Sequence, residues 1–389
     1  MLVSIATARA LPMFFAPELS LWADALADKL SGTLTDLDDP KTVARALGTR
    51  GLLSALFPEV LGGAAVGLRD RVSVRALCLT REALGYFSPL ADSVFAVQGL
   101  GTYARVLTGA IDEAGIKPFI AGDEVAGFAL TEPDAGSDVA SMRSFAEGEG
   151  SRFQLTGDKC FISNVGIAHS YVVFANANPS LGKKGISAFT MRGGITGLKE
   201  QAIATGGDHP LGALTFNRAE ATLLGEVGQG LRLALGTLDV FRTSVGAAAV
   251  GMAQRALDEA VQFVTTREQF GKKLVEFQLT QAALAEMATD LEAARLLVYR
   301  AAWAKDMGLV ANVEVAMAKM FATEAAQRVI DRAVQLLGGR GVTGDHIVHR
   351  LYREVRPLRI YEGTTEIQKL IIGSSFAKSP VRAACRGES

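Results

Sequence analysis

The stretch LAEMATDLEAARLLV, residues 284–298, decides how most of this chain folds. Its apolar residues recur at roughly helical spacing, at Leu284, Met287, Leu291 and Val298. Its charged residues fall on other faces of the same helix, at Glu286, Asp290 and Arg295. A helix with one apolar stripe must cover that stripe, so the pattern predicts neighbouring helices packed against it.

The stretch lies inside a long interval without proline, between Pro210 and Pro357. That interval is rich in Ala, Leu, Glu, Arg and Met, which are good helix formers. We therefore expect several long helices, packed as a bundle, over residues 231–389. The N-terminal third of the chain also carries helical patterns, at residues 19–30, 40–50 and 70–86.

The middle of the chain carries a different pattern. Short apolar or alternating runs, such as FQLT and YVVFA, are separated by turn material such as NPSLGKKG. This pattern predicts a small antiparallel β unit. The expected fold class is α+β and mostly α, with an N-terminal helical domain (1–125), a middle antiparallel β domain (126–230) and a C-terminal helical bundle (231–389). Clefts between such units are where cofactors usually bind.

Composition and charge limit the classes of function. The 389 residues are 49% hydrophobic and 21% charged with a net charge of −1, which is typical of a soluble globular protein. No segment concentrates Lys and Arg, so binding to nucleic acid or to an anionic membrane is disfavoured. No apolar run reaches the roughly 18 to 20 residues needed to cross a bilayer. The start of the chain makes a poor secretory signal, so we predict a cytoplasmic protein.

The cysteines and histidines form no recognisable metal or disulfide pattern. Cys78, Cys160 and Cys385 are widely spaced and make no C-x-x-C pair, which favours a reducing compartment. His346 and His349 lie close in sequence, but no carboxylate or cysteine cluster accompanies them. We therefore predict no metal site.

The stretch RIYEGTTEIQ, residues 359–368, interrupts the helical C-terminal region. One interpretation is a solvated loop between two helices, with Gly363 as a helix stop and Glu362 facing water. The other interpretation is a carboxylate presented on a turn at the edge of a cavity, poised as a base. The local sequence leaves both interpretations open.

Two stretches of the β region contain residue types that suit a flat heterocycle. ALTEPDAGSD, residues 129–138, enters a turn with hydroxyl groups and a glycine whose backbone N–H a ligand can approach. In KCFISN, residues 159–164, Phe161 and Ser163 share one face of an extended segment, so a ring can stack while a hydroxyl bonds to a ring nitrogen. Taken singly, each stretch is also compatible with an ordinary turn or a core Phe beside a surface Ser.

Two glycine-containing breaks interrupt the helical region. TREQFGKKLVEFQ, residues 266–278, carries Arg267, which either neutralises a phosphate or complements the dipole of a helix end. QLLGGRGV, residues 335–342, follows a helix and lacks G-x-G-x-x-G, so it is not a Rossmann signal.

Together these stretches resemble the acyl-CoA dehydrogenase family, whose motifs they match in order and spacing over about residues 125–375. The matching motifs are ALTEPDAGSD, KCFISN, LDVFR (238–242), GMAQRALDEA (251–260), TREQFGKKLVEFQ, QLLGGRGV and RIYEGTTEIQ. The resemblance implies an N-terminal α domain, a middle β domain and a C-terminal four-helix bundle, usually assembled as a homotetramer. It implies FAD as the cofactor, a role in fatty acid metabolism, and formation of a trans-2-enoyl-CoA from an acyl-CoA. It also implies an electron-transferring flavoprotein as the acceptor.

The same resemblance implies roles for individual residues. Glu362 is the catalytic base of the Y-E-G motif, which removes the α-proton while the β-hydride passes to flavin N5. Its backbone N–H helps to bind the thioester oxygen, and a dry pocket raises the pKa of its carboxyl towards the range useful to a base. The residues implied to contact substrate are Ser137, Asp239, Arg242 and Tyr361.

The implied FAD contacts form two sets. The first set faces the flavin ring and consists of Phe128, Leu130, Thr131, Gly136, Ser137, Phe161 and Ser163, with Thr364 and Glu366 just beyond the base. The second set grips the FAD of a neighbouring subunit and consists of Arg267, Gln269, Phe270, Leu274, Phe277, Gln278, Gln335, Gly338 and Gly339. A cofactor held by two chains makes at least a homodimer obligatory.

Some positions depart from the family pattern. Phe161 and Ser163 stand where the family often has Trp and Thr, and both changes keep the stacking face and the hydroxyl. The segment before ALTEP is abbreviated and part of the middle domain is unusual, which leaves the acyl chain length open. One branch of the family places its base near Asp239, but Val occupies position 240 here and Glu362 is present.

Three alternative functions are compatible with these motifs. The first is a flavin-dependent desaturase of an acyl thioester bound to a carrier protein, and the second is an acyl-CoA oxidase that passes electrons to O₂. The third is a non-catalytic flavin-binding relative associated with nucleic acid, which a net charge of −1 without clustered Arg or Lys disfavours.

Overall fold

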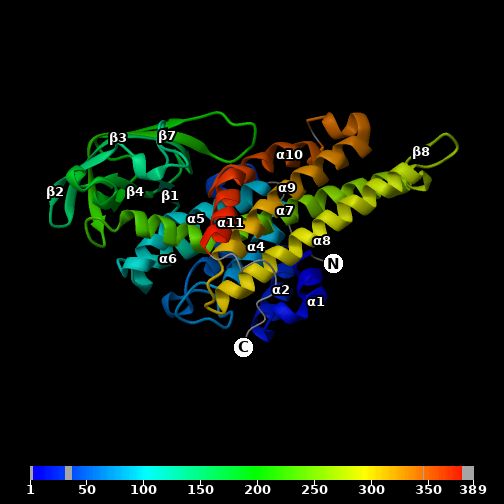
Figure 1. Ribbon diagram of the computed structural model, residues 1–389, viewed down its shortest axis with the longest axis horizontal. Coiled ribbons are helices and arrows are strands. Elements are labelled where there is room, and N and C mark those ends of the chain that lie inside the picture. The colour runs from blue at the N-terminus through cyan, green and yellow to red at the C-terminus, as the bar shows by residue number, and fades with distance from the viewer. Residues whose placement is uncertain (1–2, 31–36, 345, 379–389) are drawn as a thin grey trace.

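The computed structural model describes residues 3–30, 37–344 and 346–378. A β sheet stands at one end of a mostly helical molecule, and the long C-terminal helices run away from it (Figure 1). The predicted fold class is confirmed. Cys78 and Cys160 are free thiols, whereas Cys385 and the end of the predicted bundle, residues 379–389, lie outside the described residues.

The described part of the N-terminal region is helical. Its helices are α1 (Val3–Ala10), α2 (Pro17–Leu30), α3 (Pro40–Thr49), α4 (Val74–Phe87), α5 (Pro89–Thr108) and α6 (Glu113–Ala121). The Ser88 side chain accepts a hydrogen bond from the backbone N–H of Ala91 at 3.2 Å, which caps α5 directly after α4 ends. Helix α4 packs along helix α7 of the bundle, so polar side chains of α4 and α5 are carried into the core.

The middle of the chain forms a seven-stranded sheet. Its strands are β1 (Ala126–Ala129), β2 (Phe145–Glu149), β3 (Arg152–Ser163), β4 (Ser170–Asn176), β5 (Ile186–Arg192), β6 (Leu198–Ala202) and β7 (Leu211–Leu224). Most neighbouring strands are antiparallel, but β4 pairs in parallel with β2, with Phe145 opposite Asn176, and with β1, with Ala126 opposite Ser170. The antiparallel prediction is wrong for both pairs, of which β1–β4 is the longer. The chain passes through β2 and β3 between β1 and β4, so no hairpin fixes their relative direction.

The C-terminal region contains the longest helices. They are α7 (Gly230–Thr266), α8 (Gln278–Asp306), α9 (Asn312–Leu337), α10 (Ile347–Glu354) and α11 (Thr365–Lys378). Helices α7, α8 and α9 pack on one another and α11 packs on α9, which gives the expected four-helix bundle. A hairpin of β8 (Glu268–Gln269) and β9 (Lys272–Lys273) joins α7 to α8. It projects at the end of the molecule opposite to the sheet (Figure 1).

The apolar stripe of α8 is buried as predicted at Met287, Leu291 and Val298. Arg295, which lies on another face of α8, is also buried, and its Nε donates to Glu82 Oε1 on α4 at 3.0 Å. Its burial follows from α4, which packs on α8 as well.

Helix α7 is long and apolar enough to cross a membrane by length and composition, although we predicted no such run. The prediction counted unbroken apolar residues, whereas the apolar window of α7 also tolerates small polar ones. Within that window 67% is buried inside the protein, as in the core helix of a soluble protein. Helix α7 contacts α4, α5, α8 and α9, so it is the central helix of the fold.

Candidate active site

Glu362 stands on a strained turn between a 3₁₀ helix (Arg356–Arg359) and α11. Its φ is 53°, in the left-handed region, and Gly363 follows with a φ of 96°. A non-glycine residue in that region costs roughly 1–2 kcal/mol. Surrounding contacts must therefore hold the turn in place.

Donors from three helices hold the backbone of this turn. Arg242 Nε of α7 donates to the carbonyl oxygen of Glu362 at 2.8 Å. Lys319 Nζ of α9 and Gln368 Nε2 of α11 donate to the carbonyl oxygen of Gly363, at 2.8 and 2.9 Å. The turn is thus fixed by the bundle itself, and both carbonyls are already occupied.

Glu362 is half-buried, and one of its carboxylate oxygens is buried and available. Its Oε2 atom is inaccessible to solvent and has no hydrogen-bond partner in the described part of the chain. Burial raises the pKa of this carboxyl, while the positive charges of Arg81, Arg242 and Lys319 oppose that rise. The solvated-loop interpretation is therefore wrong, and the turn presents its carboxylate to the interior.

Beneath the turn lies a buried ion pair that the sequence analysis missed. Arg81 of α4 donates from Nε and Nη2 to the two carboxylate oxygens of Asp92 on α5, each at 2.8 Å. Its Nη1 donates to Ser244 Oγ of α7 at 3.1 Å, and its guanidinium contacts the phenol of Tyr361. One signal was present in the sequence: Asp92 is the lone acidic residue of α5, a predominantly apolar helix.

The first predicted set of cofactor residues forms an aromatic and hydroxyl-bearing ledge on the sheet, which we call the β-domain ledge (Phe128, Thr131, Phe161 and Ser163). Phe161 is 64% exposed at a φ of 55°, and Ile162 is buried beside it. Thr131 and Ser163 are half-buried, as is Phe128. The predicted extended segment is interrupted at Phe161, because its φ is left-handed and the pairing of β3 with β7 shifts register between Lys159 and Ile162, so strand alternation does not place Phe161 and Ser163 on one face.

A second ion pair, also missed, anchors the turn beside this ledge. Lys159 Nζ donates to Glu132 Oε1 at 2.8 Å and to the carbonyl oxygen of Leu130 at 3.0 Å. Glu132 also accepts from the backbone N–H groups of Arg143 and Ser144. Leu130 is itself buried, whereas Gly136 and Ser137 are exposed on the same turn. Glu132 stands in the ALTEPDAGSD motif and Lys159 in the KCFISN motif. Their opposite charges were the signal in the sequence from which this pair could have been predicted.

The second predicted set gathers at the far end of the bundle. On the β8–β9 hairpin Phe270 is 94% exposed at a φ of 53°, and its ring lies 6.3 Å from that of Phe277, centroid to centroid. The guanidinium of Arg340, next to Gly339, lies over the ring of Phe263 on α7 at 5.6 Å. Leu274 and Phe277 are half-buried and the rest of the set is exposed, at Arg267, Gln269, Gln278, Gln335, Gly338 and Gly339.

The two sets belong to opposite ends of the molecule, one to the sheet and one to the hairpin end of the bundle (Figure 1). Helix α7 starts at Gly230, which packs on Ser187 of the sheet, and runs for 37 residues to the hairpin. A helix of that length spans about 55 Å. The ledge and the hairpin therefore serve one ligand only if the hairpin comes from another copy.

The remaining predicted residues lie near Glu362. Asp239 pairs with Lys305 of α8, and Arg242 is engaged with the turn itself. Thr364 Oγ1 accepts from the backbone N–H of Ile367 at 3.3 Å, which caps α11, and Glu366 is exposed. Tyr361, expected to flank the acyl chain, faces Arg81.

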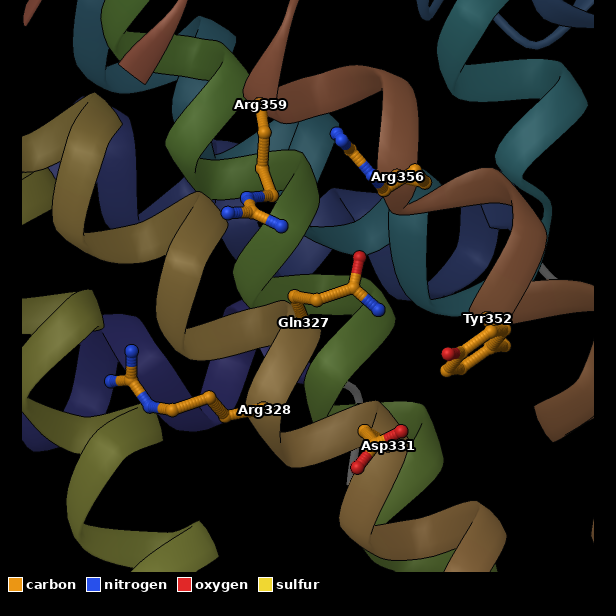
Figure 2. Close-up of a pocket in the computed structure, with 6 residues that line it drawn as sticks. All are labelled: Gln327, Arg328, Asp331, Tyr352, Arg356 and Arg359. Carbon is orange, nitrogen blue, oxygen red and sulfur yellow. The ribbon is translucent and has the colours of Figure 1, made fainter. Parts of the chain in front are cut away.

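A separate pocket of about 350 Å³ opens between α9, α10 and the 3₁₀ helix that precedes the turn (Figure 2). Its lining residues are Gln327, Arg328, Asp331, Tyr352, Arg356 and Arg359. Arg328 pairs with Asp290, and Arg359 pairs with Glu324 at 2.7 Å. None of the predicted site residues lines this pocket, so it is distinct from the Glu362 turn.

The residues of the β-domain ledge fit a flavin. An exposed aromatic ring stands beside half-buried hydroxyls, which suits stacking and hydrogen bonding to a heterocycle. At Gly136, Gly338 and Gly339 an added Cβ would meet nothing within 4 Å, so a ligand can approach the backbone there.

Comparison with known proteins agrees with this geometry. The chain matches the acyl-CoA dehydrogenase middle domain over residues 127–219 and the C-terminal domain over residues 228–376. It is 35% identical to a 3-(aryl)acrylate reductase of Clostridium sporogenes, over 91% of this chain and 94% of that protein. Butyryl-CoA dehydrogenase of Megasphaera elsdenii superposes with a TM-score of 0.84 at 33% identity, covering 92% of this chain and 97% of that one. The prolyl acyl carrier protein oxidase AnaB superposes with a TM-score of 0.83 at 25% identity, covering 93% and 99%.

The chain therefore belongs to the acyl-CoA dehydrogenase family, a family of FAD-dependent oxidoreductases. The family and cofactor predictions are confirmed at that level. The individual roles of the site residues stay predictions.

Proposed function

We propose that this protein dehydrogenates an acyl-CoA thioester to the trans-2-enoyl-CoA, with Glu362 as the base that removes the α-proton. The observation that carries the proposal is the buried Oε2 atom of Glu362, which has no partner among the described residues. A carboxylate held dry and free in this way accepts a proton readily, because burial raises the pKa of its conjugate acid.

The turn supplies a second group that the reaction needs. In the described part of the chain the backbone N–H of Glu362 donates to no other residue, while the carbonyls on either side of Gly363 are occupied. A free N–H beside the base is placed to bind the thioester oxygen, and this lowers the cost of removing the α-proton. FAD, when bound, supplies the hydride acceptor.

Electrostatics of the same residues favour an ionised base. Arg81, Arg242 and Lys319 surround Glu362, and their charges offset part of the cost of burying its carboxylate. Burial lowers the pKa of Lys319 to about 8, so its positive charge weakens above that pH. We expect activity to fall at acid pH, as Glu362 becomes protonated.

The cofactor site is proposed to form between two copies of the chain. The length of α7, about 55 Å, supports this arrangement, since this helix runs from the sheet to the hairpin within one chain. A homo-oligomer, dimer or tetramer, follows from it. We propose an electron-transferring flavoprotein as the electron acceptor, as the family resemblance implies.

A carrier-bound substrate or an oxidase reaction is the second candidate function. The observation that favours it is the structural likeness to a prolyl acyl carrier protein oxidase. Both candidates use the same base and differ in what holds the acyl group and what reoxidises the flavin. Turnover of matched acyl-CoA and carrier-bound acyl substrates, with and without O₂, separates them.

The test is anaerobic bleaching of the flavin band by a panel of acyl-CoAs, run on the wild type and on Glu362→Gln. We expect acyl-CoAs of one chain-length class to bleach the flavin of the wild type. The variant should bleach at least about a thousandfold more slowly, because it lacks the base that removes the α-proton in the transition state. FAD must stay bound to the variant. Bleaching that survives in Glu362→Gln would overturn the assignment of the base.

A further inference from the structure

The buried Arg81–Asp92 pair stands out because no helix packing requires a charge there. Arg81 is 0% exposed and Asp92 1% exposed, and both stand in helices lined with apolar residues. Burying two charges costs free energy that their attraction only partly returns, so apolar residues of similar volume would stabilise the fold at least as well. The pair therefore invites a functional explanation.

The geometry of the pair aims it at the turn that carries the base. Asp92 accepts from two nitrogens of the guanidinium and Ser244 from a third, so the plane of Arg81 is fixed from α5 and α7. Ser244 is itself held, since its hydroxyl donates to the carbonyl oxygen of Phe241 at 2.6 Å. The side of Arg81 left over faces the phenol of Tyr361, the residue directly before Glu362.

We propose that Arg81 is a positioning residue for the reaction: held by Asp92 and Ser244, it fixes Tyr361 and keeps a permanent positive charge beside the carboxylate of Glu362. This inference rests on the proposed role of Glu362 as the base. Arg81 itself touches neither substrate nor cofactor in this assignment, and Asp92 holds Arg81 in place while adding an opposing negative charge.

Charged groups reach Glu362 from each helix packed around it. Arg81 comes from α4, Asp92 from α5, Arg242 from α7 and Lys319 from α9. Arg81 is the strongest of the groups that lower the pKa of Glu362, whereas Asp92 acts in the opposite sense. The two halves of one ion pair thus bias the base in opposite directions.

Variants of Arg81 and of Asp92 should therefore shift the pH dependence of activity in opposite directions. In Arg81→Gln the base loses a stabilising charge, so the acid limb of kcat/KM moves to higher pH and activity near pH 6 falls several-fold. In Asp92→Asn the charge of Arg81 is no longer compensated, so the same limb moves to lower pH. Arg81→Lys keeps the positive charge but loses the bidentate guanidinium. The acid limb of kcat/KM should therefore lie closer to its wild-type position than in Arg81→Gln.

A second readout makes the test independent of turnover. Infrared difference spectroscopy follows the protonated carboxyl of Glu362 as a function of pH. For each FAD-loaded protein, the spectrum of its Glu362→Gln counterpart is subtracted. The midpoints should move in the same two directions as the acid limbs. If the wild type fails to dehydrogenate any acyl thioester, the proposed function fails, while the infrared titration still decides the effect of Arg81.

Controls separate positioning from loss of fold. Arg295→Gln breaks another buried pair, with Glu82, on helix α8 away from the turn, and should lower the melting temperature without moving the acid limb. If Arg81→Gln does not fold, the double variant R81M/D92L removes both buried charges, and its limb should still move upwards. The proposal would be overturned if the acid limb of kcat/KM fell at the same pH in all variants. It would also be overturned if Arg81→Gln and Asp92→Asn moved that limb in the same direction.

Discussion

Glu362 destabilises the folded chain in two ways, through its backbone and through its side chain. Its φ of 53° is unfavourable for a residue other than glycine, and its Oε2 atom lies buried with no partner among the residues that the structure describes. Both unfavourable contributions are absent from the unfolded chain. They persist in the folded chain because α7, α9 and α11 fix the turn with donors to its two carbonyls. A buried unsatisfied carboxylate is typical of a group kept for its chemistry.

This has a consequence for stability that runs against activity. A carboxyl whose folded pKa exceeds its unfolded value contributes stability that is fully present below the unfolded pKa and is lost as pH rises through the folded value. The pKa of Glu362 is raised by burial, so its ionised form destabilises the fold at neutral pH. Removing the charge should therefore relieve the structure.

We expect Glu362→Gln to melt at a higher temperature than the wild type at pH 8, by a degree or more. The difference should shrink towards pH 4, where Glu362 is protonated in both states. Scanning calorimetry of the FAD-loaded proteins across this range measures it. A variant that melts at or below the wild-type temperature at pH 8 would show that Glu362 is not strained by its charge.

At the scale of elements, the turn that carries ALTEPDAGSD depends on one buried lysine. Lys159 of β3 is 0% exposed and reaches both Glu132 and the carbonyl oxygen of Leu130. It thereby ties the end of β1 to β3 at the place where the β-domain ledge begins. Without it Glu132 would remain buried and unpaired.

Lys159→Met should cost about 3–5 kcal/mol of stability, as expected when one partner of a buried pair is removed. FAD affinity should fall with it, because Thr131 and Gly136 lose their support. Denaturant unfolding and FAD release measure the two effects. Arg143→Ala is the matched control on the same turn, since its pair with Asp134 is exposed at 80% and 68%, and it should change neither quantity measurably.

How far the sequence predicts the structure also depends on the element. Helix α8 was predictable because its period is local, but the burial of Arg295 was not, since its partner Glu82 lies 213 residues away. The parallel pairing of β1 with β4 escaped for the same reason, because no turn connects the two strands.

The candidate site divides along a similar line. Glu362 was predictable because it stands in a recognisable motif, with its glycine and its neighbouring aromatic residue. Arg81 and Asp92 carry no motif, and only the packing of α4, α5 and α7 brings them under the turn. Residues that act through others are in general visible only after the helices are placed.

At the scale of the whole molecule, the separation of the ledge from the hairpin predicts complementation between defective chains. Ser163→Ala damages the ledge and Arg267→Ala damages the hairpin, and each alone should lose FAD. A mixed dimer contains one intact site, built from the ledge of one copy and the hairpin of the other. After dissociation and random reassociation of equal amounts, roughly a quarter of all sites should recover FAD.

Flavin absorbance after gel filtration measures this recovery. Each variant mixed with itself serves as the control and should stay colourless. Recovery in those controls, or none in the mixture, would contradict a site shared between copies.

The length of α7 finally constrains how this chain can diverge. Its two ends belong to the sheet side and to the hairpin side, so under the proposed shared site this 37-residue helix sets the distance between the two half-sites of one chain. Losing one residue would rotate the hairpin by about 100° and draw it back by about 1.5 Å. Side chains along α7 can be exchanged, and loops elsewhere can lengthen, but insertions and deletions inside this helix would break two cofactor sites at once.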